Sequence, residues 1–168
     1  MTRTRKEKIR SVCPALVKER ALLMATLDVF RDDEMDYRPN APEAIRPLSV
    51  REIFMHVVDA DHRFVDGGVR GRKFTTPEFV CDESLSHIAE IVVDQPDRAG
   101  IRKALEQSWK GVEAILDWPV EALQRKVAPE NQNTLMALLT FAFLHNAQHR
   151  GQLWTYLEML GREPPRDW

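Results

Sequence analysis

One uninterrupted stretch of the chain, from Thr134 to Leu160, constrains the fold most strongly. It contains no proline and a single glycine, and its apolar residues recur at steps of three and four. This spacing predicts a long amphipathic helix. We expect Thr134 to cap its N-terminus, and Gly161 to end it ahead of Pro164 and Pro165. Its apolar stripe comprises Leu135, Leu138, Leu139, Ala142, Leu153, Tyr156, Leu157 and Leu160.

Two histidines interrupt this apolar stripe. His145 and His149 stand where the spacing would place apolar residues, and they are four residues apart. Side chains at that spacing lie one turn apart on the same helix face. Both imidazoles can therefore bind one metal ion, which would take a third ligand from elsewhere. The alternative is that each histidine is an ordinary hydrogen-bonded residue, which is the commoner case for a histidine taken alone.

The remaining sequence predicts three further helices. An N-terminal helix runs from about residue 3 to Phe30, with a defect at Pro14 because proline disrupts a helix interior. A second helix opens at Ser49, where Glu52 completes a capping box, and ends at two consecutive glycines. A third helix follows the cap residue Asp97 and stops before the next proline.

Four helices around one core make an all-α four-helix bundle. The connection between the second and third helices, residues 68–96, is too long for a tight antiparallel turn and predicts a long crossover. Within it we expect a short extra helix at about residues 84–93. We expect a single domain over residues 1–168, a size at which a chain buries about two thirds of its unfolded surface.

The composition is that of an ordinary globular chain, with 43% apolar residues, 30% charged residues and a formal net charge of −2. This charge gives no general attraction to nucleic acid or to anionic membranes. No apolar run reaches the ~18 residues of a membrane span. Five of the first ten residues are basic, and we interpret them as a solvated first helical turn. We therefore expect no nucleic-acid or membrane partner.

The cysteines and the N-terminus bear on cellular location. Cys13 and Cys81 are the chain's two cysteines, and they are far apart in the sequence with no CxxC pair. They therefore indicate neither a disulfide framework nor a zinc finger. Charged residues at 18–20 interrupt the apolar stretch that a secretory signal would need. These features predict a reducing, cytoplasmic location.

The chain has five histidines, of which three fall on core-facing helix positions: His56, His145 and His149. His62 lies six residues after His56, about 240° around the same helix, so we expect it at the surface. The acidic residues that follow His56, Asp61 among them, are assigned to the outer face of that helix. The facing set of three imidazoles is the candidate site of the chain.

Three imidazoles on facing helices would make an open site for one divalent first-row ion, and the ligand type alone admits zinc, nickel, iron or manganese. Ordinary hydrogen-bonded histidines remain the alternative. The last helix does not carry an HExxH motif, because Asn146 stands in place of the glutamate. The repeated Glu-x-x-His of di-iron bundles is also missing from the sequence.

A family resemblance bears on this choice. The segment His145-Asn-Ala-Gln-His149-Arg150-Gly151-Gln152, followed by an apolar segment, a glycine and a proline-ended tail, resembles the closing signature of the DinB-like superfamily. The helix that opens at Ser49, with its single core-facing histidine, resembles the second-helix motif of that superfamily. Tyr37-Arg38-Pro39 is similar to its entry segment.

The resemblance implies a four-helix bundle with one metal ion held by His56, His145 and His149. It also implies a supporting role for Arg150 and Gln152, which would orient the ligands from a second shell or cap neighbouring helices.

Further implications concern packing and assembly. We expect Gly151 to permit close helix approach, because a glycine inside a helix otherwise costs about 1 kcal/mol relative to alanine. The resemblance also implies a homodimer, and we expect Trp154 and Trp168 to be exposed aromatic residues that support such an interface.

The resemblance leaves two classes of function open. The first is a metal-dependent enzyme, either a hydrolase or a thiol-dependent S-transferase that acts on a small molecule with a low-molecular-weight thiol. The second is a non-catalytic, stress-related binding or structural protein in which the metal staples the bundle. An open three-histidine site favours the enzyme, whereas a fourth protein ligand would favour the staple. DNA binding is disfavoured by the charge.

Overall fold

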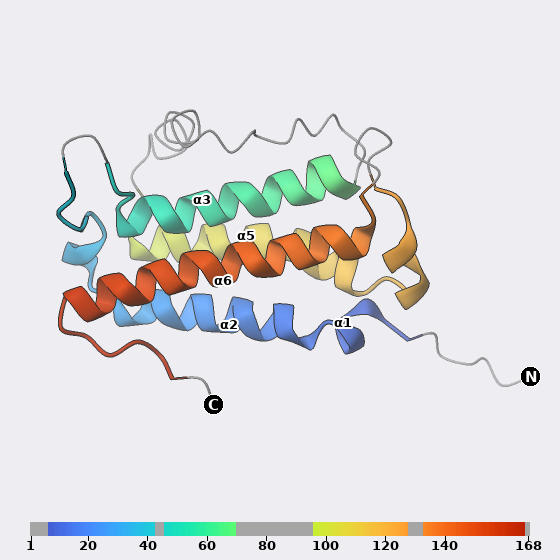
Figure 1. Ribbon diagram of the computed structural model, residues 1–168, viewed down its shortest axis with the longest axis horizontal. Coiled ribbons are helices and arrows are strands. Elements are labelled where there is room, and N and C mark those ends of the chain that lie inside the picture. Colours follow the sequence, from blue (N-terminus) through green and yellow to red (C-terminus); the bar gives the residue numbers. More distant parts are fainter. Residues whose placement is uncertain (1–6, 43–45, 70–95, 128–132, 167–168) are drawn as a thin grey trace, which may run out of the picture.

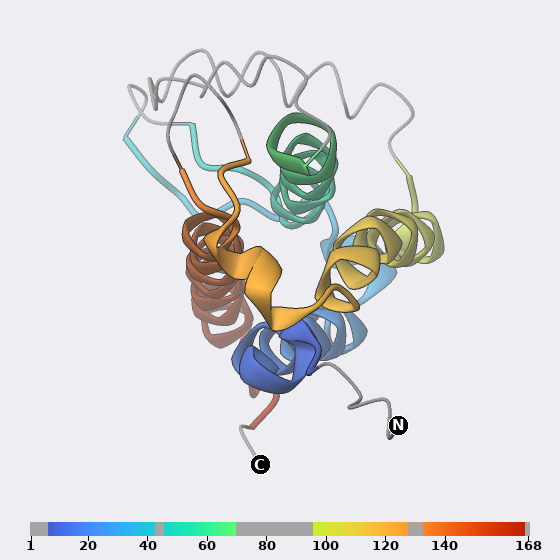
Figure 2. The same ribbon diagram turned by 90° about the vertical axis from the view of Figure 1, so that its right-hand side faces the viewer.

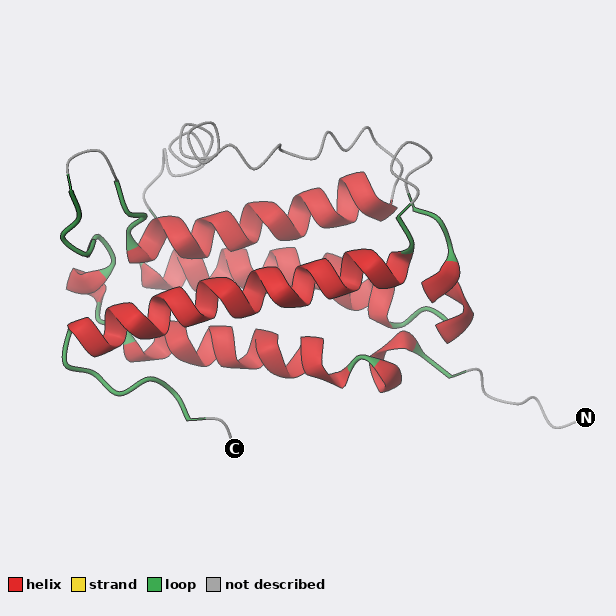
Figure 3. Ribbon diagram, in the orientation of Figure 1, coloured by secondary structure: helices red, strands yellow, loops and turns green. Residues whose placement is uncertain are grey.

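The computed structural model describes residues 7–42, 46–69, 96–127 and 133–166. These residues form helices and no strand, and four long helices build the molecule (Figure 1, Figure 3). The long helices are α2 (Pro14–Val29), α3 (Val50–Arg63), α5 (Arg98–Leu116) and α6 (Leu135–Met159). The predicted all-α four-helix bundle is confirmed.

Four short elements complete the described chain. They are α1 (Ile9–Val12), the 3₁₀ helices η1 (Asp32–Glu34) and η3 (Val120–Gln124), and the π-helix η2 (Phe64–Val69), which continues α3. The second helix therefore extends to the predicted glycine pair but changes its hydrogen-bond pattern at Phe64. None of the helices in the described ranges is both long and apolar enough to cross a membrane.

The four long helices run in two directions. In Figure 1, α2 and α6 run one way along the bundle, and α3 and α5 run the other way. Seen end-on in Figure 2, α3 and α2 occupy opposite corners of the bundle, and α5 and α6 occupy the corners between them. α3 and α5 are parallel, and residues 70–95 of the predicted crossover between them lie outside the described residues. The short helix predicted at about 84–93 lies outside the described residues.

Local capping explains where three of the long helices begin. The Ser49 hydroxyl accepts from the Glu52 amide, and the Glu52 carboxylate accepts from the Ser49 amide at 2.8 Å, which is the predicted capping box. Asp97 accepts from the Gly100 amide at 2.7 Å, and Thr134 caps α6. Each cap satisfies a backbone donor that the first helical turn would leave unpaired.

The predicted N-terminal helix is interrupted at two places in the described residues, the first before Ile9 and the second at Cys13. Residues 7 and 8 are not helical, α1 begins at Ile9, and α2 begins at Pro14. Cys13 between them has φ −121° and ψ 49°, because a residue that precedes proline is pushed out of the helical region. Pro14 is thus the first residue of a new helix, where its missing amide hydrogen costs nothing.

The core consists of two apolar clusters that follow each other along the bundle. One centres on Leu23, Phe54, Leu105 and Leu153, and the other packs Ile9 among residues of α5 and α6. Every long helix contributes fully buried side chains. Burial of one leucine or phenylalanine contributes about 1.5 to 3 kcal/mol, so these contacts hold the helices that carry the histidines.

A buried ion pair crosses this core, and the prediction that Asp61 faces outward was wrong. Asp61 of α3 is 4% exposed, and its Oδ2 lies 3.1 Å from Nη1 of Arg20 on α2. The Ser108 hydroxyl of α5 donates to the same carboxylate oxygen at 2.8 Å and accepts from Arg20 at 3.2 Å. The guanidinium also lies 5.2 Å from the ring centroid of Trp109. This cluster ties three helices together.

Candidate metal centre

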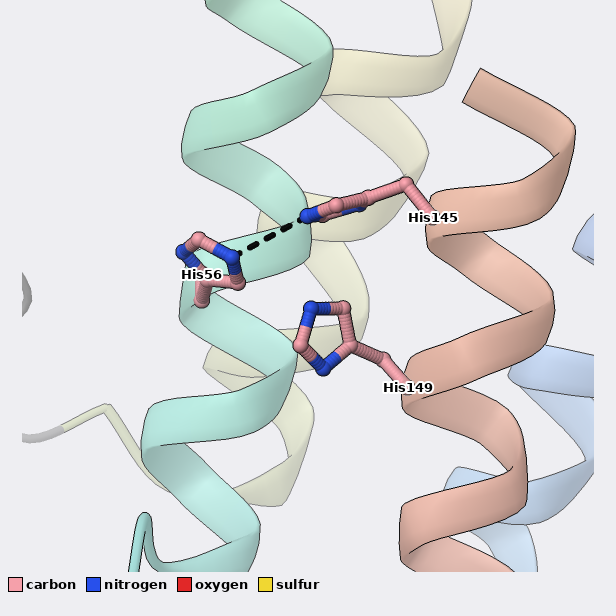
Figure 4. A group of neighbouring side chains, drawn as sticks. All are labelled: His56, His145 and His149. Carbon is pink, nitrogen blue, oxygen red and sulfur yellow. Dashed lines mark hydrogen bonds between the residues drawn. The ribbon is translucent and has the colours of Figure 1, made fainter. Parts of the chain in front are cut away.

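The three predicted histidines come together between α3 and α6. His56 extends from α3, and His145 and His149 extend from successive turns of α6 toward it (Figure 4). His145 and His149 are each 8% exposed, and His56 is half-buried. The antiparallel packing of α3 against α6 brings one histidine opposite two that share a helix face. The four-residue spacing of His145 and His149 on α6, together with the capped start of α3, thus brings the three histidines together.

The distances within the cluster suit a single metal ion. The Nε2 atoms of His56 and His145 are 3.0 Å apart. The ring centroids of the three histidines are separated by 4.9, 4.8 and 4.5 Å, and one nitrogen from each ring lies within 4.8 Å of the others. Nitrogen ligands at about 2.0 to 2.1 Å from one zinc ion lie about 2.9 to 3.4 Å from one another. The His56–His145 separation already falls in this range, and the group as a whole, within 4.8 Å, could hold one ion if the rings moved toward one another.

Burial keeps the imidazoles of His145 and His149 neutral. Burial lowers the pKa of His145 to about 3, and the neighbouring histidines add to this shift. Burial likewise lowers the pKa of His149 to about 4, with His56 as the second cause. At neutral pH each of these rings therefore has one nitrogen lone pair available. A neutral imidazole is the form that binds metal, so the donor set fits a divalent ion.

Gln152 supports His149 directly. Its Oε1 lies 3.3 Å from Nδ1 of His149, and its Nε2 donates to the Tyr156 hydroxyl at 3.3 Å. That hydroxyl donates to the backbone carbonyl of Leu48 at 3.0 Å, immediately before the cap of α3. The sequence prediction treated Tyr156 only as part of the apolar stripe. Its position four residues after Gln152, on the face of the histidines, was the available signal.

Arg150 points away from the cluster, toward α2. Its Nη2 donates to Glu19 at 3.1 Å, and its Nε pairs with the other oxygen of that buried carboxylate. The guanidinium also lies 4.2 Å from the Trp154 ring centroid, and the Trp154 indole donates to Thr26 at 2.9 Å. These contacts tie α6 to the interior of α2 and are neither the ligand contact nor the helix cap that the sequence predicted for Arg150.

Two packing predictions for this end of α6 were wrong. Gly151 is exposed, and a Cβ atom built there would meet nothing within 4 Å, so it does not serve close helix approach. Trp154 is half-buried against α2 and is not an exposed aromatic residue. Trp168 lies outside the described residues.

The other histidines do not join the cluster as far as the structure describes them. His62 is exposed, as predicted, and His87 lies outside the described residues. Over the described ranges, the group of side chains able to hold a metal consists of the three histidines, with no carboxylate or thiol among them. Phe141, which the sequence prediction missed, lies with its ring 5.8 Å from that of His145 and is 44% exposed.

Comparison with known proteins identifies the family. A profile of the DinB superfamily matches residues 15–153, which include all four long helices up to the last turns of α6. The chain belongs to the DinB superfamily. The crystal structure of a DinB-like protein from Bacillus subtilis is similar to it, with a TM-score of 0.65 and 19% sequence identity over 93% of this chain and 96% of that chain. At this identity the likeness concerns the fold. No curated protein matches the sequence.

Proposed function

We propose that this DinB-superfamily protein binds one divalent transition-metal ion through His56, His145 and His149 and acts as a metal-dependent enzyme. The observation that carries the proposal is the convergence of three imidazoles from two helices, with ligand nitrogens within 4.8 Å of one another and with the pKa values of His145 and His149 lowered by burial. Burying three polar rings is costly, and a metal ion bound by all three would lower that cost. Zinc, nickel, iron and manganese all accept this donor set.

The ligand number favours catalysis. Three protein ligands leave coordination positions for a water or a substrate, as in catalytic zinc sites. The described residues supply no fourth protein ligand to the group. A bound ion would lower the pKa of a water or thiol in an open position and so supply a nucleophile at neutral pH. We therefore propose a hydrolase, or an S-transferase that uses a low-molecular-weight thiol, acting on a small molecule.

The protein's own groups would shape that site. The half-buried His56 lies nearest to solvent, and the two buried histidines lie deeper in the bundle. The exposed Phe141 ring beside His145 offers an apolar surface next to the ligands. The Gln152 side chain contacts Nδ1 of His149. Such a site would orient a substrate by contact with Phe141 while the histidines face its reacting group.

A second candidate is a metal staple without catalysis. It is favoured by the position of the cluster, because one ion would cross-link α3 to α6 in the bundle interior. A stapled bundle would lose most of its thermal stability when the metal is removed, whereas an enzyme with an open site would stay folded. The stress-related role, the homodimer and the cytoplasmic location remain predictions attached to either function.

The deciding experiment is elemental mass spectrometry on untagged protein, compared with the variants His149→Ala and His62→Ala. We expect about one transition-metal ion per chain in the wild type, loss of that ion in His149→Ala, and retention in His62→Ala, whose histidine is exposed. Thiol-transfer and hydrolase assays on metal-loaded and metal-stripped protein would follow. Folded wild-type protein that holds no ion and cannot be loaded would contradict the proposal.

A further inference from the structure

A chain of hydrogen bonds runs from the candidate metal centre to the entry of α3. It joins His149, Gln152 and Tyr156 of α6 to the backbone carbonyl of Leu48, at separations of 3.3, 3.3 and 3.0 Å. Leu48 directly precedes Ser49, whose capping box fixes the start of the helix that carries His56. We call these four groups the His149 relay. The relay therefore ends on an acceptor that is held in place by the fold.

The chemistry of these groups allows the relay only one direction. A carbonyl oxygen only accepts, so the single hydroxyl hydrogen of Tyr156 is used on Leu48. The hydroxyl oxygen must then accept from Gln152, which requires the amide nitrogen of Gln152 to face Tyr156. The amide oxygen consequently faces Nδ1 of His149, and that nitrogen must carry the hydrogen. A flipped Gln152 amide would set two acceptors against each other at Tyr156.

The tautomer of His149 follows from this direction. With Nδ1 protonated, the lone pair of the neutral ring is on Nε2, and Figure 4 shows that one ring nitrogen of His149 faces His56 and His145. We infer that Tyr156, acting through Gln152, is a positioning residue that sets His149 in its metal-binding tautomer before any metal arrives. The consequence for metal affinity rests on the proposed function, but the tautomer itself does not.

His145 provides an internal contrast. Its Nε2 lies 3.0 Å from Nε2 of His56, so in the metal-free protein a hydrogen bond there requires one of these two nitrogens to carry the hydrogen. That hydrogen has to leave before both rings bind an ion. His149 needs no such change. The relay therefore makes His149 the ligand that is ready first.

The direct test is the tautomer of His149 in metal-free protein, measured by long-range proton–nitrogen correlation NMR with His149→Ala used for assignment. We expect the wild type to show hydrogen on Nδ1 alone. In Tyr156→Phe the amide of Gln152 is free to turn, and we expect a mixture with the Nε2-protonated form. Tyr37→Phe is the matched control, because it removes a hydroxyl from the ring that packs on Tyr156 but lies outside the relay. We expect it to match the wild type.

Zinc affinity, measured by chelator competition, tests the consequence. We expect Tyr156→Phe to bind Zn²⁺ about tenfold more weakly, at the lower end of the 10- to 100-fold range for groups that orient a ligand, and Tyr37→Phe to be unchanged. The double variant Gln152→Glu with Tyr156→Phe should recover the loss, because both carboxylate oxygens accept and neither needs orientation. A purely structural role for Tyr156 would give no recovery.

The outcomes separate the inference from the proposed function. If His149 keeps its hydrogen on Nδ1 in Tyr156→Phe, or if the double variant binds zinc no better than Tyr156→Phe, the positioning role is overturned. If the wild type binds no zinc, the proposed function fails. The tautomer measurement in the metal-free protein would still decide whether the relay sets His149.

Discussion

Two buried polar clusters share helix α3, and they are built in opposite ways. The Asp61 cluster faces α2 and α5 and consists of an ion pair with a hydroxyl between its members. The histidine cluster faces α6 and consists of three imidazoles whose nitrogens converge. His56 and Asp61 are five residues apart, about 140° around one helix. A single helix thus carries two kinds of polar cluster. On one face, oppositely charged and hydroxyl groups pair with one another, which we call a closed cluster, and on another face the nitrogens of three like groups converge.

The difference lies in how the polar groups are paired. In the Asp61 cluster, Arg20 donates to Ser108, Ser108 donates to Asp61, and Nη1 of Arg20 forms an ion pair with the same Asp61 oxygen. Burial raises the pKa of Asp61 and lowers that of Arg20, and their attraction opposes both shifts. In the histidine cluster, all members have the same chemistry: His56 and His145 share one contact between their Nε2 atoms at 3.0 Å, and the nitrogens of all three rings converge. Burial alone therefore does not distinguish the two clusters, whereas converging nitrogens form a group that could hold one metal ion.

Removing Asp61 should have the largest effect on stability. In Asp61→Ala, Arg20 remains buried without its counter-charge, which costs about 3 to 5 kcal/mol, and urea unfolding would measure the loss. The double variant Arg20→Met with Asp61→Leu should restore most of it, because apolar residues often replace a buried pair at little cost. Provided that they fold, Asp61→Ala and the double variant should both keep the metal content of the wild type. A loss below about 1 kcal/mol in Asp61→Ala would contradict the closed-cluster interpretation.

The histidine cluster should make the metal-free protein sensitive to acid. The pKa values of His145 and His149 in the folded chain, about 3 and about 4, lie below the ordinary 6.5. Between pH 6.5 and those values the unfolded chain binds more protons, so stability falls as the pH falls. Each histidine contributes a loss of about 1.4 kcal/mol per pH unit within this window. Urea unfolding with a chelator between pH 7 and pH 5 would measure the slope.

A matched pair of variants tests which histidines cause this dependence of stability on pH. The double variant His145→Leu with His149→Leu should lose most of it, whereas His62→Leu should keep it, because His62 is exposed. A metal-free wild type whose stability is flat between pH 7 and pH 5 would show that the buried imidazoles do not resist protonation. The contrast between the two clusters would then lose its electrostatic basis.

The sequence predicted the histidine cluster but not the Asp61 cluster, for a physical reason. The positions of His145 and His149 on one face of α6 follow from their four-residue spacing, and the start of α3 follows from the Ser49 cap. These signals are local. The burial of Asp61 depends on Ser108, 47 residues away, and on Arg20 of a third helix. Side chains at the edge of an amphipathic face are placed by such distant partners, which periodicity does not reveal.

The same limit applies to the support of the metal centre. Gln152 could be singled out from a motif, but its orientation depends on Tyr156 and on the Leu48 carbonyl, which is 108 residues away from Tyr156. Arg150, within the same motif, is directed instead to Glu19, 131 residues away. Neighbours in sequence on α6 therefore serve different partners, and only the packing of α2 and α3 against α6 separates their roles.

Gly151 lies between these two residues and offers the smallest and most selective test. It is exposed inside α6, and an added Cβ would meet nothing within 4 Å. Gly151→Ala should therefore raise the free energy of unfolding by about 0.5 to 1 kcal/mol through helix propensity alone, measured by urea unfolding. Zinc affinity and the tautomer of His149 should not change. A destabilised Gly151→Ala variant would mean that a second surface packs on this turn of α6 in solution, and the predicted homodimer would be the first assembly to examine by light scattering.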